Sequence, residues 1–104
     1  MPVLRIGRDD DFRPGRIERR ALLGRHIAVL RRTDGTLAAT EANCRHQNAD
    51  LTAGAREGDI VTCPRHGWRY DLATGECLTE PWARLRTFRI WSAEGDVFLD
   101  TTPR

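Results

Sequence analysis

Two short segments of the chain each combine a cysteine with a histidine. The first segment contains Cys44 and His46, and the second contains Cys63 and His66. Because few residues separate the members of each pair, a single turn can present both to one metal centre. Thiolate sulfur and imidazole nitrogen suit zinc or iron. The four side chains therefore predict either a structural zinc ion bound by all four, or a [2Fe–2S] cluster with both thiolates on one iron and both imidazoles on the other.

The residues around these ligands distinguish the two interpretations. The run CPRHGWRYDLATG at residues 63–75 resembles the second cluster-binding loop of Rieske iron–sulfur proteins. The runs CRHQ at 44–47 and ADL at 49–51 resemble the first loop. The order and separation of the two loops also fit, and the likeness extends over nearly the whole chain. It is strongest toward the soluble ferredoxins that serve bacterial ring-hydroxylating dioxygenases.

This resemblance implies both a fold and a cofactor. The implied fold is all-β, a Rieske-like antiparallel β sandwich of three stacked sheets with a small cluster-binding subdomain. Residues 1–104 then form a single domain, with cluster-binding loops at about 42–59 and 63–67. The implied cofactor is one [2Fe–2S] cluster, and its implied ligands are Cys44, His46, Cys63 and His66.

The ligand set also bears on the reduction potential. By resemblance, Cys44 and Cys63 bind the inner iron, while His46 and His66 bind the outer iron near the surface. Neutral imidazoles leave such a cluster less negative than four thiolates do. The potential then lies at about −150 to +300 mV, against about −400 mV for plant-type ferredoxins. We expect the electron to settle on the histidine-bound iron and to leave through the imidazole edges.

The neighbouring residues indicate the low-potential class within this range. High-potential relatives have a serine at the position of Trp68 and a disulfide between the loops at the positions of Ala49 and Arg65, and this chain has neither. Hydrogen bonds to sulfur stabilise the more negative reduced cluster. The high-potential relatives also have a tyrosine at the position of Tyr70. We expect the Tyr70 hydroxyl to reach the Cys44 sulfur and to raise the potential modestly.

Several further residues have both a functional and a structural interpretation. Arg45 and Arg65 either tune the potential and form a docking surface or are solvated surface charges. Asn48 stands where a glycine is usual, and asparagine tolerates left-handed backbone better than most residues. Cys77 is expected to be a small buried residue. Pro81-Trp82 resembles the third loop that shields a Rieske cluster.

The elements that must position these residues are mostly β-strands. Short apolar runs alternate with Gly, Asp, Asn and Pro, and no segment keeps a helical period over three turns. Thr33-Asp34-Gly35 and Glu94-Gly95-Asp96 predict hairpin turns. We expect strands near Val3–Ile6, Ile17–Ala21, His26–Arg31, Leu37–Glu41, Ile60–Thr62, Trp68–Asp71, Arg84–Trp91 and Val97–Asp100.

The composition narrows the possible functions. The chain has 104 residues, a formal net charge of +2 and 17 basic side chains, all of them arginine. This balance argues against nucleic-acid binding, and the lack of lysine and of glycine-rich phosphate motifs argues against nucleotide chemistry. No apolar run is long enough to span a membrane, and residues 1–10 lack the apolar core of a secretory signal. We therefore expect a cytoplasmic protein without a membrane partner.

We expect an electron carrier rather than an enzyme. Two of the three histidines would bind the cluster, and His26 alone cannot supply a two-histidine, one-carboxylate iron site that activates oxygen. The resemblance implies a monomer that accepts electrons from a flavin-dependent reductase and passes them to a terminal ring-hydroxylating oxygenase. Two alternatives are a fixed subunit of a larger oxidoreductase, such as the small subunit of nitrite reductase, and a zinc-stabilised interaction module.

Overall fold

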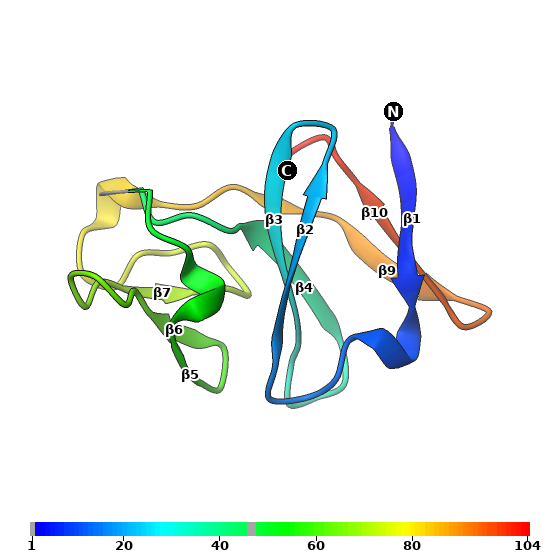
Figure 1. Cartoon of the computed structure of the whole chain (residues 1–104), viewed down its shortest axis with the longest axis horizontal. Helices are drawn as coiled ribbons and strands as arrows, with labels where there is room; N and C mark the ends of the chain where they lie inside the picture. Colours follow the sequence, from blue (N-terminus) through cyan, green and yellow to red (C-terminus); the bar gives the residue numbers. More distant parts are fainter. Residues whose placement is uncertain (1, 46–47) are drawn as a thin grey trace.

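Short antiparallel strands form the framework of the protein. The computed structural model describes residues 2–45 and 48–104. In this part of the chain, ten strands form three antiparallel sheets (Figure 1). The first sheet has the order β1 (Val3–Arg8), β10 (Asp96–Asp100) and β9 (Ile90–Ala93). The second has the order β2 (Ile17–Leu22), β3 (Arg25–Arg31), β4 (Leu37–Glu41) and β8 (Thr87–Phe88). The third has the order β5 (Ala55–Glu57), β6 (Ile60–Thr62) and β7 (Arg69–Asp71).

Within residues 2–45 and 48–104, three short 3₁₀ helices connect the strands: η1 (Asp9–Asp11), η2 (Leu51–Ala53) and η3 (Pro81–Ala83). None of the helices in the described residues is long and apolar enough to cross a membrane. The predicted all-β class with three antiparallel sheets is therefore confirmed.

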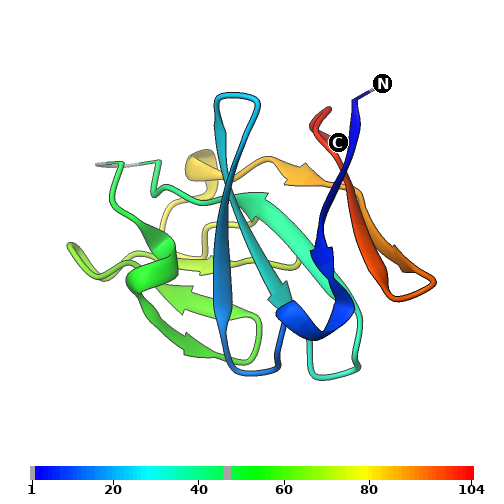
Figure 2. The same ribbon diagram turned by 45° about the vertical axis from the view of Figure 1, so that its right-hand side comes forward.

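The sheet of β2, β3, β4 and β8 lies between the other two sheets (Figure 2). Successive side chains of a strand point to opposite faces, so a strand between two layers is apolar on both. Strand β3 shows this pattern: Ile27 and Val29 enter a core with Val97, whereas Ala28 and Leu30 enter a second core with Tyr70. This second core also contains both cysteines of the predicted site and underlies the sheet of β5, β6 and β7.

Both predicted hairpin turns are confirmed. The segment Thr33–Gly35 joins β3 to β4, and Asp34 accepts a hydrogen bond from the backbone N–H of Thr36 at 2.9 Å. Between β9 and β10, Glu94 and Gly95 have φ of 53° and 82°. Two successive residues with positive φ match the right-handed twist of the strands that they connect.

Three sequence-based expectations require correction. The segment 42–59 is not one open loop, because it contains η2 and β5. The expected strand Arg84–Trp91 is divided at Arg89 into β8, which pairs with β4, and β9, which pairs with β10. The chain thus passes from the central sheet to the outer sheet within what reads as one apolar run. The strand expected at Trp68–Asp71 begins at Arg69.

Candidate metal centre

The first predicted ligand loop is closed by two backbone hydrogen bonds around its cysteine. The N–H of Cys44 donates to the carbonyl of Ala49 at 2.8 Å, and the N–H of Asn48 donates to the carbonyl of Cys44 at 2.9 Å. Asn48 has a φ of 55°, the left-handed conformation that its type tolerates. The expectation that asparagine replaces glycine in this loop without breaking it is confirmed.

The second loop repeats this geometry. The N–H of Cys63 donates to the carbonyl of Trp68 at 2.7 Å, and the N–H of Gly67 donates to the carbonyl of Cys63 at 3.0 Å. Gly67 has a φ of 73° and occupies the place that Asn48 has in the first loop. The two loops therefore present their cysteines through the same backbone turn.

The two sulfur donors are buried, whereas the imidazole of His66 is exposed. Cys44 and Cys63 are 3% and 2% exposed and belong to the same core, whereas His66 is exposed. Predicted ligand His46 lies outside the described residues. Two buried soft donors beside a surface imidazole fit a [2Fe–2S] cluster with one iron in the protein and one at its surface.

Tyr70 of β7 connects the first loop to the core. Its hydroxyl lies 3.2 Å from the Cys44 sulfur and accepts a hydrogen bond from the N–H of Arg45, also at 3.2 Å. Burial, followed by the hydrogen bond with Cys44, raises the pKa of Tyr70 well above its usual value, so the hydroxyl keeps its proton. The expected contact of this hydroxyl with the Cys44 sulfur is confirmed.

A polar network that the sequence did not reveal holds the first loop from outside. Arg19 of β2 donates to Asp50 at 2.8 Å and to Asn43 at 3.0 Å, and Asn43 donates to Asn48 at 2.9 Å. Burial alone would raise the pKa of Asp50, but hydrogen bonds from Thr52 and the charge of Arg19 together lower it. Asp50 is thus an ionised partner for Arg19, and the network restrains residues on both sides of Cys44.

Two tryptophans connect the second loop to η3. The rings of Trp68 and Trp82 meet edge to face, with centroids 5.7 Å apart and planes at 80°. Trp68 packs against the core that contains the cysteines, whereas Trp82 is 62% exposed. The segment Pro81-Trp82, which resembles a shielding loop, therefore lies against the second ligand loop.

Of the remaining residues, Cys77 is buried and His26 is exposed. Cys77 is 5% exposed and its sulfur accepts a hydrogen bond from the N–H of Glu80 at 3.3 Å, which confirms that it is a small buried residue. His26 is exposed on β3 and lines a cavity of about 590 Å³ between the β2–β3 hairpin and the first loop. Arg25 and Arg45 line the same cavity.

The family of the chain follows from its sequence. The Rieske [2Fe–2S] domain model matches residues 3–89. The chain belongs to the Rieske [2Fe–2S] domain family. It is 31% identical over 97 residues to Ferredoxin CarAc of Metapseudomonas resinovorans, covering 92% of this chain and 91% of that protein.

Other relatives of the chain are much longer. It is 37% identical over 79 residues to the oxygenase component of 3-ketosteroid-9-alpha-monooxygenase of Rhodococcus rhodochrous. That match covers 76% of this chain and 21% of the relative. The chain thus spans about a fifth of the length of this relative.

Solved structures agree with this assignment. A chain in the complex of reduced oxygenase and oxidized ferredoxin of carbazole 1,9a-dioxygenase superposes with a TM-score of 0.88 at 32% identity, covering 98% of this chain and 95% of that one. The ferredoxin of carbazole 1,9a-dioxygenase from Nocardioides aromaticivorans superposes with a TM-score of 0.85 at 22% identity, which shows the shared fold. Membership of this family implies one [2Fe–2S] cluster, and the described donor set fits it.

Proposed function

We propose that this Rieske protein is a cytoplasmic one-electron carrier, not itself a catalyst. It accepts electrons from a flavin-dependent reductase and passes them to a terminal ring-hydroxylating oxygenase. The observation that carries this proposal is its similarity to Ferredoxin CarAc over more than nine-tenths of both chains. The structural similarity to a chain in a complex of oxygenase and ferredoxin supports the choice of partner.

The proposed ligands are Cys44, His46, Cys63 and His66. A cluster of this type, when bound, takes up and releases one electron. The buried cysteines keep their sulfurs away from water, while the exposed His66 offers a short path between the metal centre and a partner. Trp68, where high-potential relatives have a serine, and the lack of cysteine at positions 49 and 65 support a potential in the low Rieske class.

The histidine count supports a carrier rather than an oxygenase. With two histidines assigned to the cluster, only His26 remains for any second iron site, and it stands exposed on β3. A solved structure named as the small subunit of an NADPH nitrite reductase superposes with a TM-score of 0.82, but at 19% identity this likeness shows the fold alone. We propose a monomer that dissociates from its partners, which gel filtration of the purified protein tests directly.

Replacing a proposed histidine ligand tests the site. The wild-type protein should contain equal iron and inorganic sulfide and give a rhombic electron paramagnetic resonance signal when reduced. His66→Cys and His46→Cys should lower the potential or abolish this signal, because a thiolate adds negative charge at the outer iron. His26→Gln is the control and should leave both unchanged. A protein containing only zinc, or an unaltered signal in both cysteine variants, would refute the assignment.

A further inference from the structure

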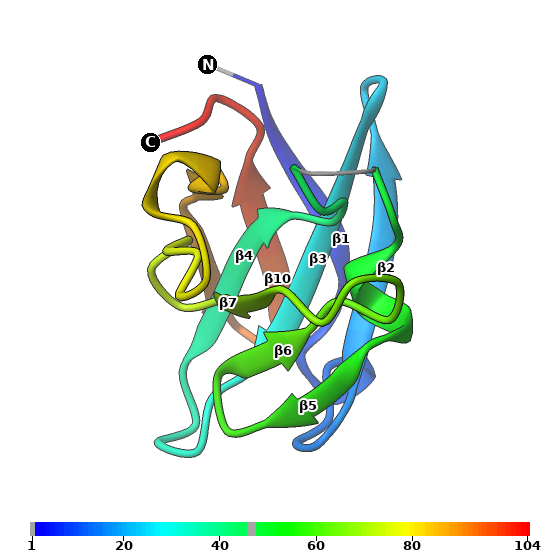
Figure 3. The ribbon, with the colours of Figure 1, turned by 90° about the vertical axis from the view of Figure 1, so that its left-hand side faces the viewer.

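The surface around His66 has a distinct distribution of charge. The ligand-loop segments 44–48 and 63–69 contain three arginines and no acidic residue. We define the loop face as Arg45, Arg65, Arg69, Leu78 and Trp82, all of which are exposed. The backbone of the second ligand loop and of η3 lies on the side of the molecule that faces the viewer in Figure 3.

The arginines of the loop face are weakly neutralised by the protein itself. Arg45 has a long ion pair of 3.9 Å with Glu41. No acidic side chain of the described residues pairs with Arg65 or Arg69. Nearby Asp50 is bound by Arg19. In a chain whose total net charge is only +2, the loop face is therefore a local excess of positive charge.

The loop face also contains two large apolar side chains, those of Leu78 and Trp82. Trp82 and Leu78 are 62% and 49% exposed, although large apolar side chains are usually buried. Trp82 is held in place by its edge-to-face contact with Trp68. Leu78 is fixed beside Arg69, because its N–H donates to the Arg69 carbonyl at 2.8 Å. Rigid exposed aromatic residues next to arginines are typical of the energetic centres of protein interfaces.

The acidic residues at the rim do not cancel this charge. The segment that contains η3 adds Glu80 and Arg84, which balance each other in formal charge. Glu41 is half-buried and accepts a hydrogen bond from the N–H of Arg86 at 2.7 Å, so part of its carboxylate is engaged by the protein.

We infer that the loop face docks a redox protein whose contact surface presents carboxylates around an apolar patch. This inference rests on the proposed function and specifies the chemistry of the partner. The arginines accelerate encounter with an acidic surface, and burial of Trp82 and Leu78 slows dissociation. Since Arg65 directly precedes His66 in sequence, contacts with Arg65 bring the partner to the proposed exit of the electron.

Two small oxidants of opposite charge measure the charge of the loop face without any partner protein. The dithionite-reduced protein is mixed in a stopped-flow instrument with ferricyanide, an anion, or with hexaamminecobalt(III), a cation. Arg65→Gln/Arg69→Gln should slow oxidation by ferricyanide several-fold at low ionic strength and accelerate oxidation by the cobalt complex. Both effects should vanish at about 1 M salt, where the screening length is about 3 Å.

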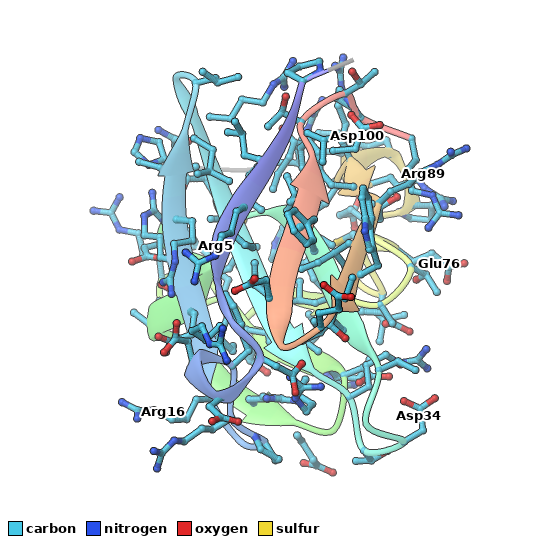
Figure 4. The ribbon with its side chains drawn as sticks, turned by 90° about the vertical axis from the view of Figure 1, so that its right-hand side faces the viewer. Arg5, Arg16, Asp34, Glu76, Arg89 and Asp100 are labelled. Atoms are coloured by element: carbon cyan, nitrogen blue, oxygen red, sulfur yellow. The ribbon has the colours of Figure 1, made fainter. Side chains whose placement is uncertain are left out.

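The ratio of the two rates distinguishes a change in the charge of the loop face from a change in the driving force for electron transfer. A shift in reduction potential changes both rates in the same direction, whereas loss of local charge changes them in opposite directions. Arg13→Gln/Arg16→Gln is the matched control, because it removes the same charge from the turn before β2. Figure 4 views the molecule from the side opposite to Figure 3 and shows Arg16 pointing away at the base of the fold.

A protein electron acceptor tests the contribution of Trp82, an apolar residue of the loop face. Trp82→Ala should slow reduction of an acidic plastocyanin several-fold more than it alters oxidation by ferricyanide, since it removes contact area and no charge. Trp91→Ala is the control, because Trp91 is also exposed but lies on the outer sheet. Unchanged rates with plastocyanin in Trp82→Ala would remove Trp82 from the docking surface.

The outcomes distinguish this inference from the function on which it rests. If the control variant alters the ratio of rates as much as Arg65→Gln/Arg69→Gln does, the inference is overturned while electron transfer stands. If the wild-type protein takes up no electron from dithionite, the proposed function fails, and the inference fails with it.

Discussion

The hydroxyl of Tyr70 is placed to influence the electronic properties of the site. It accepts a hydrogen bond from the backbone of Arg45, which leaves its own proton directed to the Cys44 sulfur. A hydrogen bond to a sulfur ligand favours the more negative, reduced state of a cluster. Because Tyr70 is buried and its pKa is raised, it remains a donor at any ordinary pH.

Tyr70→Phe should therefore lower the midpoint potential. A hydrogen bond worth about 0.5–1.5 kcal/mol, converted for one electron, corresponds to a decrease of about 20–60 mV. A redox titration followed by circular dichroism measures this change, with Trp91→Phe as a control remote from the cysteines. A potential equal to that of the wild-type protein would show that the hydrogen bond has no net preference for the reduced state.

Among the secondary-structure elements, β2 contributes to the site without containing a ligand. Arg19 extends from this strand to Asp50 and Asn43, on either side of Cys44. The second loop has Gly67 at its left-handed position, whereas the first has Asn48, whose side chain joins this network. The Arg19 network is thus positioned to hold the first loop in its ligand-presenting conformation.

Arg19→Gln should make the cluster easier to lose. Without the ion pair to Asp50, the first loop opens more often, and iron release to a chelator should be several-fold faster. The control is Arg20→Gln on the same strand, since Arg20 lies over the Phe12 ring at 5.1 Å and donates to the carbonyl of Ile6 at 3.4 Å. That variant should lower the melting temperature more than it alters iron release, and equal release from both variants would contradict a positioning role for Arg19.

Sequence patterns predicted some elements fully and others not at all. Strands Leu37–Glu41 and Ile60–Thr62 have the predicted bounds, because each is a short run of mostly apolar and β-branched residues between turn signals. Strand β5, with the sequence Ala55–Glu57, has no β-branched or aromatic residue, and its conformation depends on pairing with β6. The change of sheet at Arg89 was also hidden, since local periodicity does not specify a pairing partner.

The candidate site likewise combines residues that are close in sequence with residues that only the fold brings together. The ligand loops could be predicted because their residues are close in sequence and follow a family pattern. Arg19 could not, because its partners Asn43 and Asp50 lie 24 and 31 residues away. The loop face also required the structure, since Trp82 and Trp68 come together only through the packing of η3 on the second loop.

At the scale of the whole molecule, two separate cores lie on opposite faces of the central sheet. One core contains Cys44, Cys63 and Val61, and the other contains Val29 and Val97. A metal centre that joins two loops stabilises the folded state of those loops directly. Removal of the metal centre should therefore destabilise the core that contains the cysteines far more than the other core.

Hydrogen exchange of the protein before and after removal of iron and sulfide tests this expectation. Amides of β6 and β7 should lose protection by more than about tenfold in the cluster-free protein, because the second proposed ligand loop connects these strands. Amides of β3 and β10 should keep most of their protection and serve as the internal reference. An equal loss in all four strands would show that the two cores unfold as one unit.

The two ends of the chain are held together by the outer sheet. The N–H and the hydroxyl of Thr101 both donate to the carbonyl of Pro2, at 3.0 and 3.1 Å. In Figure 1 strands β1 and β10, which adjoin Pro2 and Thr101, lie on the right, whereas the cysteine loops lie on the left. An anchor on an electrode surface, or a fused reductase module, could therefore be attached through either terminus with the same outward orientation of the cysteine loops.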